Sequence, residues 1–234
     1  MFKGLLSFSF LFLILILNMG ADRQPMLSQR SVIWIGDSRC VGIKRSCQIR
    51  QEDFFIAEGE KSYRWFVDTA LPRLRRILDK DPDQIVIIMI GFNDCFNQAY
   101  GAVESYTAYA PVINDLISQY PDTIFCFCSV NPVDDRYHFA MQFGKKNIAK
   151  DKDAINPIIE TFNTYLKKNC RAYYMDSYHY LEDHGFETKD GIHYTKATYG
   201  SIYDFCLKEL VHPITEVSMK HTLDYLKRIS MESE

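Results

Sequence analysis

A serine near the N-terminus directly follows a short apolar run, in the segment Gly36-Asp37-Ser38-Arg39. The preceding residues, Val32 to Ile35, predict a buried strand. A tight turn at Gly36 would present the next side chains at the carboxyl edge of a sheet, where open α/β sheets keep their sites. Ser38 is therefore a candidate nucleophile, provided that a base and an oxyanion-binding group lie elsewhere in the chain.

The candidate base is His193, in the segment Asp190-Gly191-Ile192-His193-Tyr194. Because the two residues are three apart around a glycine, the Asp190 carboxylate can turn back onto the imidazole of His193. Such a carboxylate fixes the tautomer of the ring and stabilises the imidazolium that forms when histidine takes the serine proton. The pair precedes Thr195, a predicted helix N-cap, and so lies at a strand-to-helix edge.

The candidate oxyanion-binding side chain is Asn93, in the segment Gly91-Phe92-Asn93-Asp94. This segment follows the run 85–90, whose continuous β-branched character is typical of a central parallel strand buried on both faces. Asn93 is thus predicted at the same sheet edge as Ser38. Its amide could donate a hydrogen bond to a developing oxyanion there.

Each of these residues also has an ordinary structural explanation. Ser38 could cap a short helix that follows it, Asn93 suits a turn at a strand end, and a loop histidine such as His193 is often merely exposed to solvent. The nucleophile elbow G-x-S-x-G of the α/β-hydrolases is missing, because Cys40 stands where its last glycine would be. That fold is therefore not expected.

The elements that must position these residues alternate between strand and helix along the chain. Besides the strands at 32–35 and 85–90, strands are predicted at 54–57, 124–130 and 172–175. Helices are predicted at about 62–78 (kinked or split by Pro72), 102–120, 155–166 and 195–211, with loop at 176–190. This alternation predicts an α/β fold with a mostly parallel five-stranded sheet covered by helices on both faces. The sequence indicates one domain at 31–211 and a helical tail at 212–234.

The composition narrows the function classes. Of 234 residues, 47% are hydrophobic, which suits one sizeable core, and the net charge of -3 gives no reason to expect nucleic acid as a partner. The seven cysteines are odd in number and include no C-x-x-C, so they do not indicate a disulfide framework. Cys126 and Cys128 are predicted on one face of a strand and lack zinc-site spacing. Neither a metal nor a cofactor is expected.

Residues 1–21 are typical of a targeting segment. Lys3 precedes the apolar run 5–17, and small residues follow it, as in an export signal. The run is shorter than the roughly 20 residues that comfortably span a bilayer. Because Asn18 and Met19 make a poor cleavage site, an uncleaved membrane anchor is the alternative. In both cases the domain is expected outside the cytoplasm, secreted or membrane-anchored, with membrane attachment through this segment only.

The ordered set of motifs resembles the SGNH (GDSL-type) hydrolase family over about residues 31–211. Gly-Asp-Ser follows the first strand, an isolated Gly59 the second and Gly-x-Asn-Asp the third, and Asp-x-x-His precedes the last helix. The resemblance implies a flavodoxin-like three-layer α/β/α sandwich. It implies Ser38 as nucleophile and backbone oxyanion donor, with Gly59 as a second backbone donor and Asn93 as the side-chain donor. It implies His193 as base and Asp190 as the acid that orients it.

Two features depart from the family pattern. Arg39 stands where the family usually has leucine, which could place a positive charge near the site and favour polar or anionic substrates. The segment around Gly59 has one glycine and little else to fix its register. The backbone N–H of Glu60 or Ser62 could therefore replace that of Gly59.

Combined with export, the resemblance implies a serine esterase that acts through an acyl-enzyme on a small-molecule or glycan ester. Deacetylation of extracellular or cell-wall carbohydrate is the first expectation, with lipid or short aryl esters as alternatives. An O-acyltransferase on glycans, or a catalytically silent carbohydrate-binding module, could share the same fold. The segment 131–150 is predicted to form either a recognition loop beside the site or a surface excursion. It carries Tyr137, His138, Phe139, Phe143, Lys145 and Lys146.

Overall fold

The computed structural model describes residues 30–99, 106–134, 139–143, 146–150 and 152–232. Its centre is a five-stranded sheet in the order β2-β1-β3-β4-β7, and every pairing in it is parallel. The strands are β1 (Val32–Gly36), β2 (Phe54–Ala57), β3 (Ile85–Met89), β4 (Ile124–Cys128) and β7 (Tyr173–Met175). The predicted fold class is confirmed.

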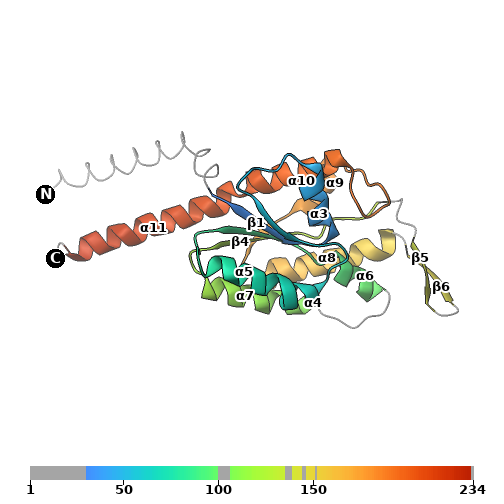
Figure 1. Cartoon of the computed structure of the whole chain (residues 1–234), viewed down its shortest axis with the longest axis horizontal. Helices are drawn as coiled ribbons and strands as arrows, with labels where there is room; N and C mark the ends of the chain where they lie inside the picture. Colours follow the sequence, from blue (N-terminus) through green and yellow to red (C-terminus); the bar gives the residue numbers. More distant parts are fainter. Residues whose placement is uncertain (1–29, 100–105, 135–138, 144–145, 151, 233–234) are drawn as a thin grey trace.

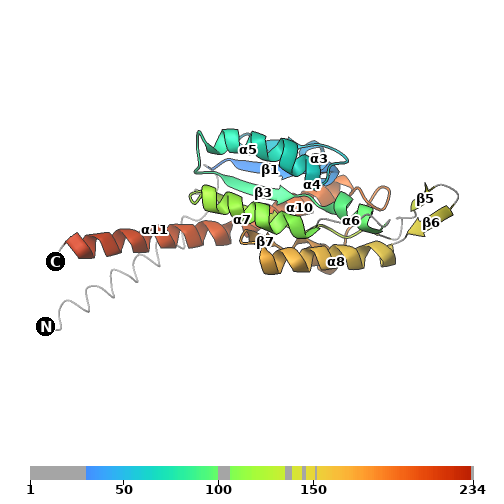
Figure 2. The same ribbon diagram turned by 90° about the horizontal axis from the view of Figure 1, so that it is seen from below.

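Helices cover both faces of the sheet, as Figures 1 and 2 show. One face packs against α4 (Tyr63–Trp65), η1 (Phe66–Ala70), α5 (Leu71–Leu78), α6 (Phe92–Ala99), α7 (Tyr109–Gln119) and α8 (Lys152–Asn169). The other packs against α3 (Ser38–Ser46), α9 (Ser177–His184), α10 (Lys196–Glu209) and the first turn of α11 (Val211–Glu232). The remaining elements are η2 (Tyr106–Ala108), β5 (Phe139–Phe143) and β6 (Lys146–Lys150).

The buried strands explain why two separate cores form. All five residues of β1, of β3 and of β4 are buried. Because successive side chains of a strand point to opposite faces, Ile33 and Ile35 enter one core while Val32 and Trp34 enter the other. The continuous apolar runs in the sequence thus require helices on both sides.

The register brings the ends of three neighbouring strands level. Gly36, the last residue of β1, pairs with Ala57 of β2 and with Met89 of β3. The segments that follow these strands therefore leave the sheet side by side at its carboxyl edge. Ser38, Gly59 and Asn93 all belong to these segments.

Gly36 permits a close approach between β1 and β3. A Cβ atom at this position would clash with the Met89 carbonyl oxygen and lie 2.5 Å from the Cys40 Cβ. The backbone N–H of Asp37 donates to the same carbonyl at 3.3 Å, and α3 begins at the next residue. The absence of a side chain at Gly36 therefore lets the strand pass into a helix within two residues.

Several boundaries differ from those predicted. The predicted loop at 176–190 is wrong over its first half, because α9 occupies Ser177–His184. The Asp176 side chain caps this helix, and Tyr178 and Leu181, three residues apart, face the interior. The helix α6 was not predicted, and it places Asn93 within a helix rather than in a turn.

The helix predicted at 62–78 is continuous, but it contains a π-helical stretch. Its α4 and α5 parts are joined by η1, and Pro72 lies in the first turn of α5. Proline has no N–H to donate, which explains why the regular hydrogen-bond pattern changes here. Of the helix predicted at 102–120, residues 102–105 lie outside the described part, and η2 and α7 occupy the rest.

Two elements extend beyond the body at opposite ends of the molecule (Figures 1 and 2). The antiparallel hairpin β5–β6 lies within the segment 131–150, where a recognition loop or surface excursion was predicted. Residues 135–138, with Tyr137 and His138, and residues 144–145 are outside the described part. The helix α11 occupies most of the predicted tail. Residues 1–21 are also outside the described part, and within that part no helix combines the length and apolarity needed to cross a bilayer.

We expect Gly36→Ala to lower the free energy of unfolding by about 1–3 kcal/mol, because its methyl group has no room between β1 and β3. Urea denaturation of the purified variant measures this loss. The matched control is Gly200→Ala in α10, where a Cβ meets nothing within 4 Å and alanine is the better helix former. Equal stability of the two variants would contradict the explanation.

Candidate active site

Ser38 is the first residue of α3 and is half-buried at the carboxyl edge of the sheet. Asp37, not Ser38, is the N-cap, and its carboxylate accepts a hydrogen bond from the Arg39 backbone N–H at 3.0 Å. The simple capping explanation for Ser38 is therefore wrong. Its hydroxyl is available for a different partner.

That partner is the imidazole of His193. The His193 Nε2 lies 3.2 Å from the Ser38 Oγ, although the two residues are 155 positions apart in the chain. On the other side of the ring, Nδ1 lies 2.7 Å from Asp190 Oδ2. This is the geometry in which a carboxylate orients a histidine so that its second nitrogen can take a proton from serine.

The Asp190 carboxylate is held by its own loop. Its Oδ1 accepts the backbone N–H of Ile192 at 2.9 Å and of His193 at 2.7 Å. Burial opposes the charge of Asp190, but the hydrogen bonds from the backbone N–H and ring of His193 and from the Ile192 N–H outweigh it and lower the pKa of this carboxyl. Asp190 is thus ionised at neutral pH, as an orienting acid must be.

The loop that carries Asp190 and His193 is fastened to the segment after β4. The backbone N–H of Asp134 donates to the Gly191 carbonyl at 3.2 Å. The Thr188 hydroxyl donates to Asp134 Oδ2 at 2.7 Å and accepts the Gly191 N–H at 2.8 Å. Neither Thr188 nor Asp134 was predicted from the sequence, because neither belongs to a motif.

The candidate oxyanion donors lie in α6 and in the turn after β2, and these two segments contact each other. The Asn93 Nδ2 donates to the Lys61 carbonyl at 2.8 Å, which joins α6 to the turn between β2 and α4. Gly59 lies in the same turn, and the Glu58 N–H donates to the Gly36 carbonyl at 3.1 Å. Among the described contacts, none joins Asn93 or Gly59 to Ser38, so their role as oxyanion donors stays a prediction.

The turn around Gly59 also bears on its register. Glu60, not Gly59, has a positive φ of 61°. A Cβ at Gly59 would meet nothing within 4 Å. Neither backbone conformation nor packing therefore requires glycine at position 59. A remaining reason for glycine there is that a substrate oxygen can approach its backbone N–H without meeting a side chain. Glu60 and Ser62 stay the alternatives.

Arg39 was expected to place a positive charge near the substrate, and the structure places it elsewhere. Its side chain is only 3% exposed, and its guanidinium donates to the backbone carbonyls of Asn131 and Pro132 at 2.5 and 3.5 Å. A buried guanidinium held in this way does not face the substrate. The predicted preference for polar or anionic substrates because of Arg39 is therefore wrong.

A second aspartate–histidine pair with the same spacing is not part of this constellation. His179 Nδ1 lies 2.8 Å from Asp176 Oδ1 on the exposed start of α9, and this hydrogen bond raises the pKa of His179. The spacing alone thus occurs twice in the chain. Only the pair at Asp190 and His193 reaches a serine hydroxyl within the described part of the chain.

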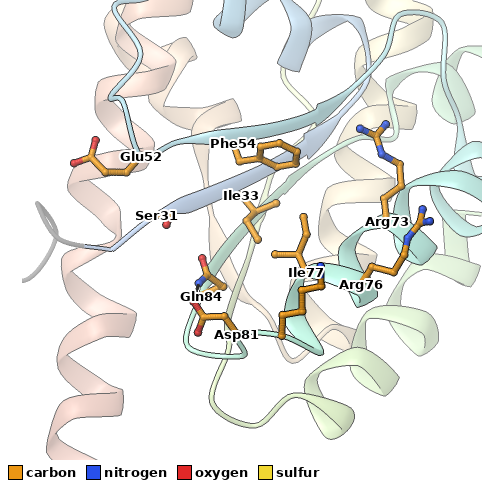
Figure 3. A pocket seen from close by; sticks show the side chains of 10 residues that line it. Ser31, Ile33, Glu52, Phe54, Arg73, Arg76, Ile77, Asp81 and Gln84 are labelled. Carbon is orange, nitrogen blue, oxygen red and sulfur yellow. Dashed lines mark hydrogen bonds between the residues drawn. The ribbon is translucent and has the colours of Figure 1, made fainter.

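A pocket of about 560 Å³ lies away from Ser38 (Figure 3). Its lining includes Ser31 and Ile33 at the start of β1, Phe54 of β2 and residues of α5. It therefore opens towards the amino ends of the strands and contains none of the predicted catalytic residues. No cluster of three or more metal-binding side chains occurs in the described residues.

Comparison with known families agrees with this geometry. The model of the GDSL-like lipase/acylhydrolase family matches residues 54–204. The chain belongs to this family. The match includes the segments of Gly59, Asn93, Asp190 and His193. It begins after Ser38, so Ser38 is assigned to the same site by its hydrogen bond to His193. The protein is thus a serine ester hydrolase of the GDSL (SGNH) type.

Solved structures of the same fold are distant in sequence. A lipase/acylhydrolase from Enterococcus faecalis is 14% identical, with a TM-score of 0.52 over 79% of this chain and 96% of that one. A GDSL-like lipase from Bacteroides thetaiotaomicron is 19% identical (TM-score 0.52; 78% and 88% covered). A catalytic mutant of an acetylxylan esterase from Geobacillus stearothermophilus is 11% identical (TM-score 0.51; 80% and 94% covered). A comparison with curated proteins finds no match.

The buried carboxyl of Asp37 should make stability depend on pH. Burial raises its pKa to about 6, although hydrogen bonds from the Arg39 and Phe92 N–H groups and the charge of Arg39 favour the ionised form. Because the folded pKa exceeds the unfolded value of about 3.9, this group stabilises the fold most below pH 4, and the contribution is lost as pH rises through 6. For Asp37→Asn, which can still cap α3, we expect the stability relative to the parent to rise by about 3 kcal/mol between pH 3.5 and 7.5.

Urea denaturation of the parent and of Asp37→Asn across this pH range measures the difference. A difference that stays constant with pH would show that Asp37 does not titrate in this way.

Proposed function

We propose that this protein is a serine esterase that removes acetyl groups from carbohydrate outside the cytoplasm, with Ser38 as nucleophile, His193 as base and Asp190 as its orienting acid. The observation that carries the catalytic part is the chain of hydrogen bonds from Asp190 to His193 at 2.7 Å and from His193 to Ser38 at 3.2 Å. Such a chain activates a serine hydroxyl for attack on an ester carbonyl.

In the first half of the reaction, His193 takes the Ser38 proton and the serine oxygen attacks the carbonyl carbon. The oxyanion that forms accepts hydrogen bonds from the Ser38 and Gly59 N–H groups and from the Asn93 amide. The Ser38 N–H lies in the first turn of α3, where backbone donors lack partners within the helix. Asn93 has two amide protons, and its hydrogen bond to Lys61 uses one of them.

Collapse of the tetrahedral intermediate then breaks the ester C–O bond, and His193 gives its proton to the leaving alcohol. Water, deprotonated by His193, attacks the acyl-enzyme and releases the acid. The Asp190 side chain is 54% exposed and that of His193 42%, so the site lies open at the surface. An open site suits an ester group carried on a large molecule that does not enter a cavity.

Two observations favour acetylated carbohydrate over lipid or aryl esters, and acetylxylan esterases share the fold, although lipases do too. The site is open rather than a deep apolar pocket, as the exposures of Asp190 and His193 indicate. The sequence of residues 1–21 is that of an export signal or membrane anchor, which would bring the enzyme to extracellular or cell-wall glycans. Membrane attachment, where it occurs, would be through this segment only.

Ser38→Ala should abolish ester hydrolysis, because no other group can form the acyl-enzyme, while the circular dichroism spectrum stays that of the parent. The measurement is the release of p-nitrophenol from p-nitrophenyl acetate, followed by the release of acetate from acetylated xylan. Hydrolysis by Ser38→Ala at the parent rate would disprove the assignment.

The same assay separates the other functions. A parent protein that binds acetylated glycan but releases no acetate would be a silent binding module. Transfer of acetyl to an added sugar in preference to water would make the enzyme an O-acyltransferase.

Asn93→Ala should lower kcat about 10²–10³-fold with little change in KM, because the amide acts mainly on the charge that develops in the transition state. Steady-state kinetics with p-nitrophenyl acetate measures both constants. Because the substitution also removes the hydrogen bond to the Lys61 backbone carbonyl, urea denaturation of the same variant checks that the fold is retained. An Asn93→Ala enzyme with kcat near that of the parent would exclude the amide from the oxyanion hole.

A further inference from the structure

Arg39 follows Ser38 and contacts the segments of Asn93 and His193, although it touches none of the reacting atoms. We infer that Arg39 is a positioning residue whose buried guanidinium fixes the separation of Ser38, Asn93 and His193. The inference rests on the proposed roles of these three residues. Arg39 is the immediate neighbour of Ser38 in α3, and its side chain is 3% exposed.

The guanidinium lies over aromatic rings from the other two segments. The Arg39 Cζ lies 4.1 Å from the centroid of the Phe92 ring and 5.2 Å from that of Tyr194. Phe92 directly precedes Asn93, and Tyr194 directly follows His193. Cation–π contacts of this kind are strongest when they are shielded from water.

The edge of the guanidinium donates to a rigid segment of backbone. Its acceptors are the carbonyls of Asn131 and Pro132, and the Tyr194 hydroxyl also donates to the Pro132 carbonyl at 2.6 Å. Arg39 and Tyr194 thus hold the same short stretch after β4. Asp134, two residues further on, holds the loop of His193.

Amides of α8 fix this stretch from the opposite side. The Asn163 side chain pairs with both the N–H and the carbonyl of Val130, at 2.8 and 2.9 Å. The Asn156 side chain pairs in the same way with Val133, at 2.9 and 3.1 Å. The backbone of residues 130–133 is therefore held in place. Because Arg39 is hydrogen-bonded to this backbone, the position of the neighbouring Ser38 is fixed relative to it.

Stability alone does not account for a charge at this position. Burying a guanidinium is costly, and its Nε has no hydrogen-bond partner within the described part of the chain. The charge of Arg39 favours the ionised form of Asp37, the residue before Ser38, but no carboxylate of the described residues lies within 4 Å of the Arg39 guanidinium. A leucine, usual in the family, would fill the space without this cost but could not donate to the two carbonyls.

Loss of Arg39 should slow most the step that depends most on the placement of His193. A p-nitrophenolate leaves without a proton, whereas a sugar alkoxide must receive one from His193 as the ester bond breaks. Loss of Arg39 should therefore slow the hydrolysis of sugar acetates more than that of p-nitrophenyl acetate. A loss of folded protein would slow both equally.

The experiment compares full-length parent, Arg39→Leu and Arg39→Lys on p-nitrophenyl acetate and on a fully acetylated methyl xyloside. For Arg39→Leu we expect kcat to fall about tenfold on the aryl ester and about 100-fold or more on the sugar ester, with KM changed less than about threefold. Arg39→Lys keeps the charge and should restore part of the loss on both esters. If Arg39→Leu does not fold, Arg39→Lys carries the same comparison with the parent.

Two control variants separate positioning from stability. Leu74→Ala creates a cavity in the core of α5, far along the chain from the site, and should lower the activity on both esters by one common factor. Tyr194→Phe keeps the ring over Arg39 but removes the hydrogen bond to Pro132, and should show a smaller loss with the same preference between esters.

An unchanged ratio of the two activities in Arg39→Leu and Arg39→Lys would overturn the inference for Arg39. Full activity of Ser38→Ala would instead overturn the proposed function, so the two failures are distinguishable.

Discussion

The level ends of the parallel strands are the constraint on which the site depends. Gly36 pairs with Ala57 and Met89, so the turns after β1, β2 and β3 start at one height and lie next to one another. A register shift of one residue would turn every inward side chain of a strand to the other face. The two separate cores oppose such a shift in β1, β3 and β4, because all residues of these strands are buried. Hydrophobic packing in the body therefore determines where the polar groups at the edge meet.

The polar groups are then fixed by interactions that packing does not supply. Two buried charged residues flank Ser38, the proposed nucleophile. Asp37 caps α3 and also accepts the N–H of Phe92 at the start of α6, and Arg39 bridges to the segment after β4. Charges buried in this way cost free energy, and their value lies in specifying one arrangement among several of similar packing. The buried charged residues on either side of Ser38 thus lower the stability of the fold but hold Ser38 in one position.

The strands and most of the candidate site residues were predictable from the sequence. The apolar runs define the strands within one or two residues, and the motifs at Ser38, Asn93 and Asp190–His193 have fixed spacing and a fixed order. What could not be predicted depends on distant contacts. Arg39 was expected to face substrate because local sequence does not reveal the carbonyls, 92 and 93 positions away, that its side chain reaches. The helix α9 was missed although Asp176, which caps it, is of a residue type preferred at helix N-termini. The helix α6 was missed because Gly91 and Asn93 suit a turn as well as the start of a helix.

The hydrogen bond between Ser38 and His193 joins residues 155 positions apart, and almost the whole sandwich lies between them. Closing so long a loop is entropically costly and is repaid only when the intervening strands have docked. During synthesis on the ribosome, Ser38 emerges 155 residues before His193. A nascent polypeptide therefore cannot form the hydrogen bond between them until the strands β2, β3, β4 and β7 have all been made.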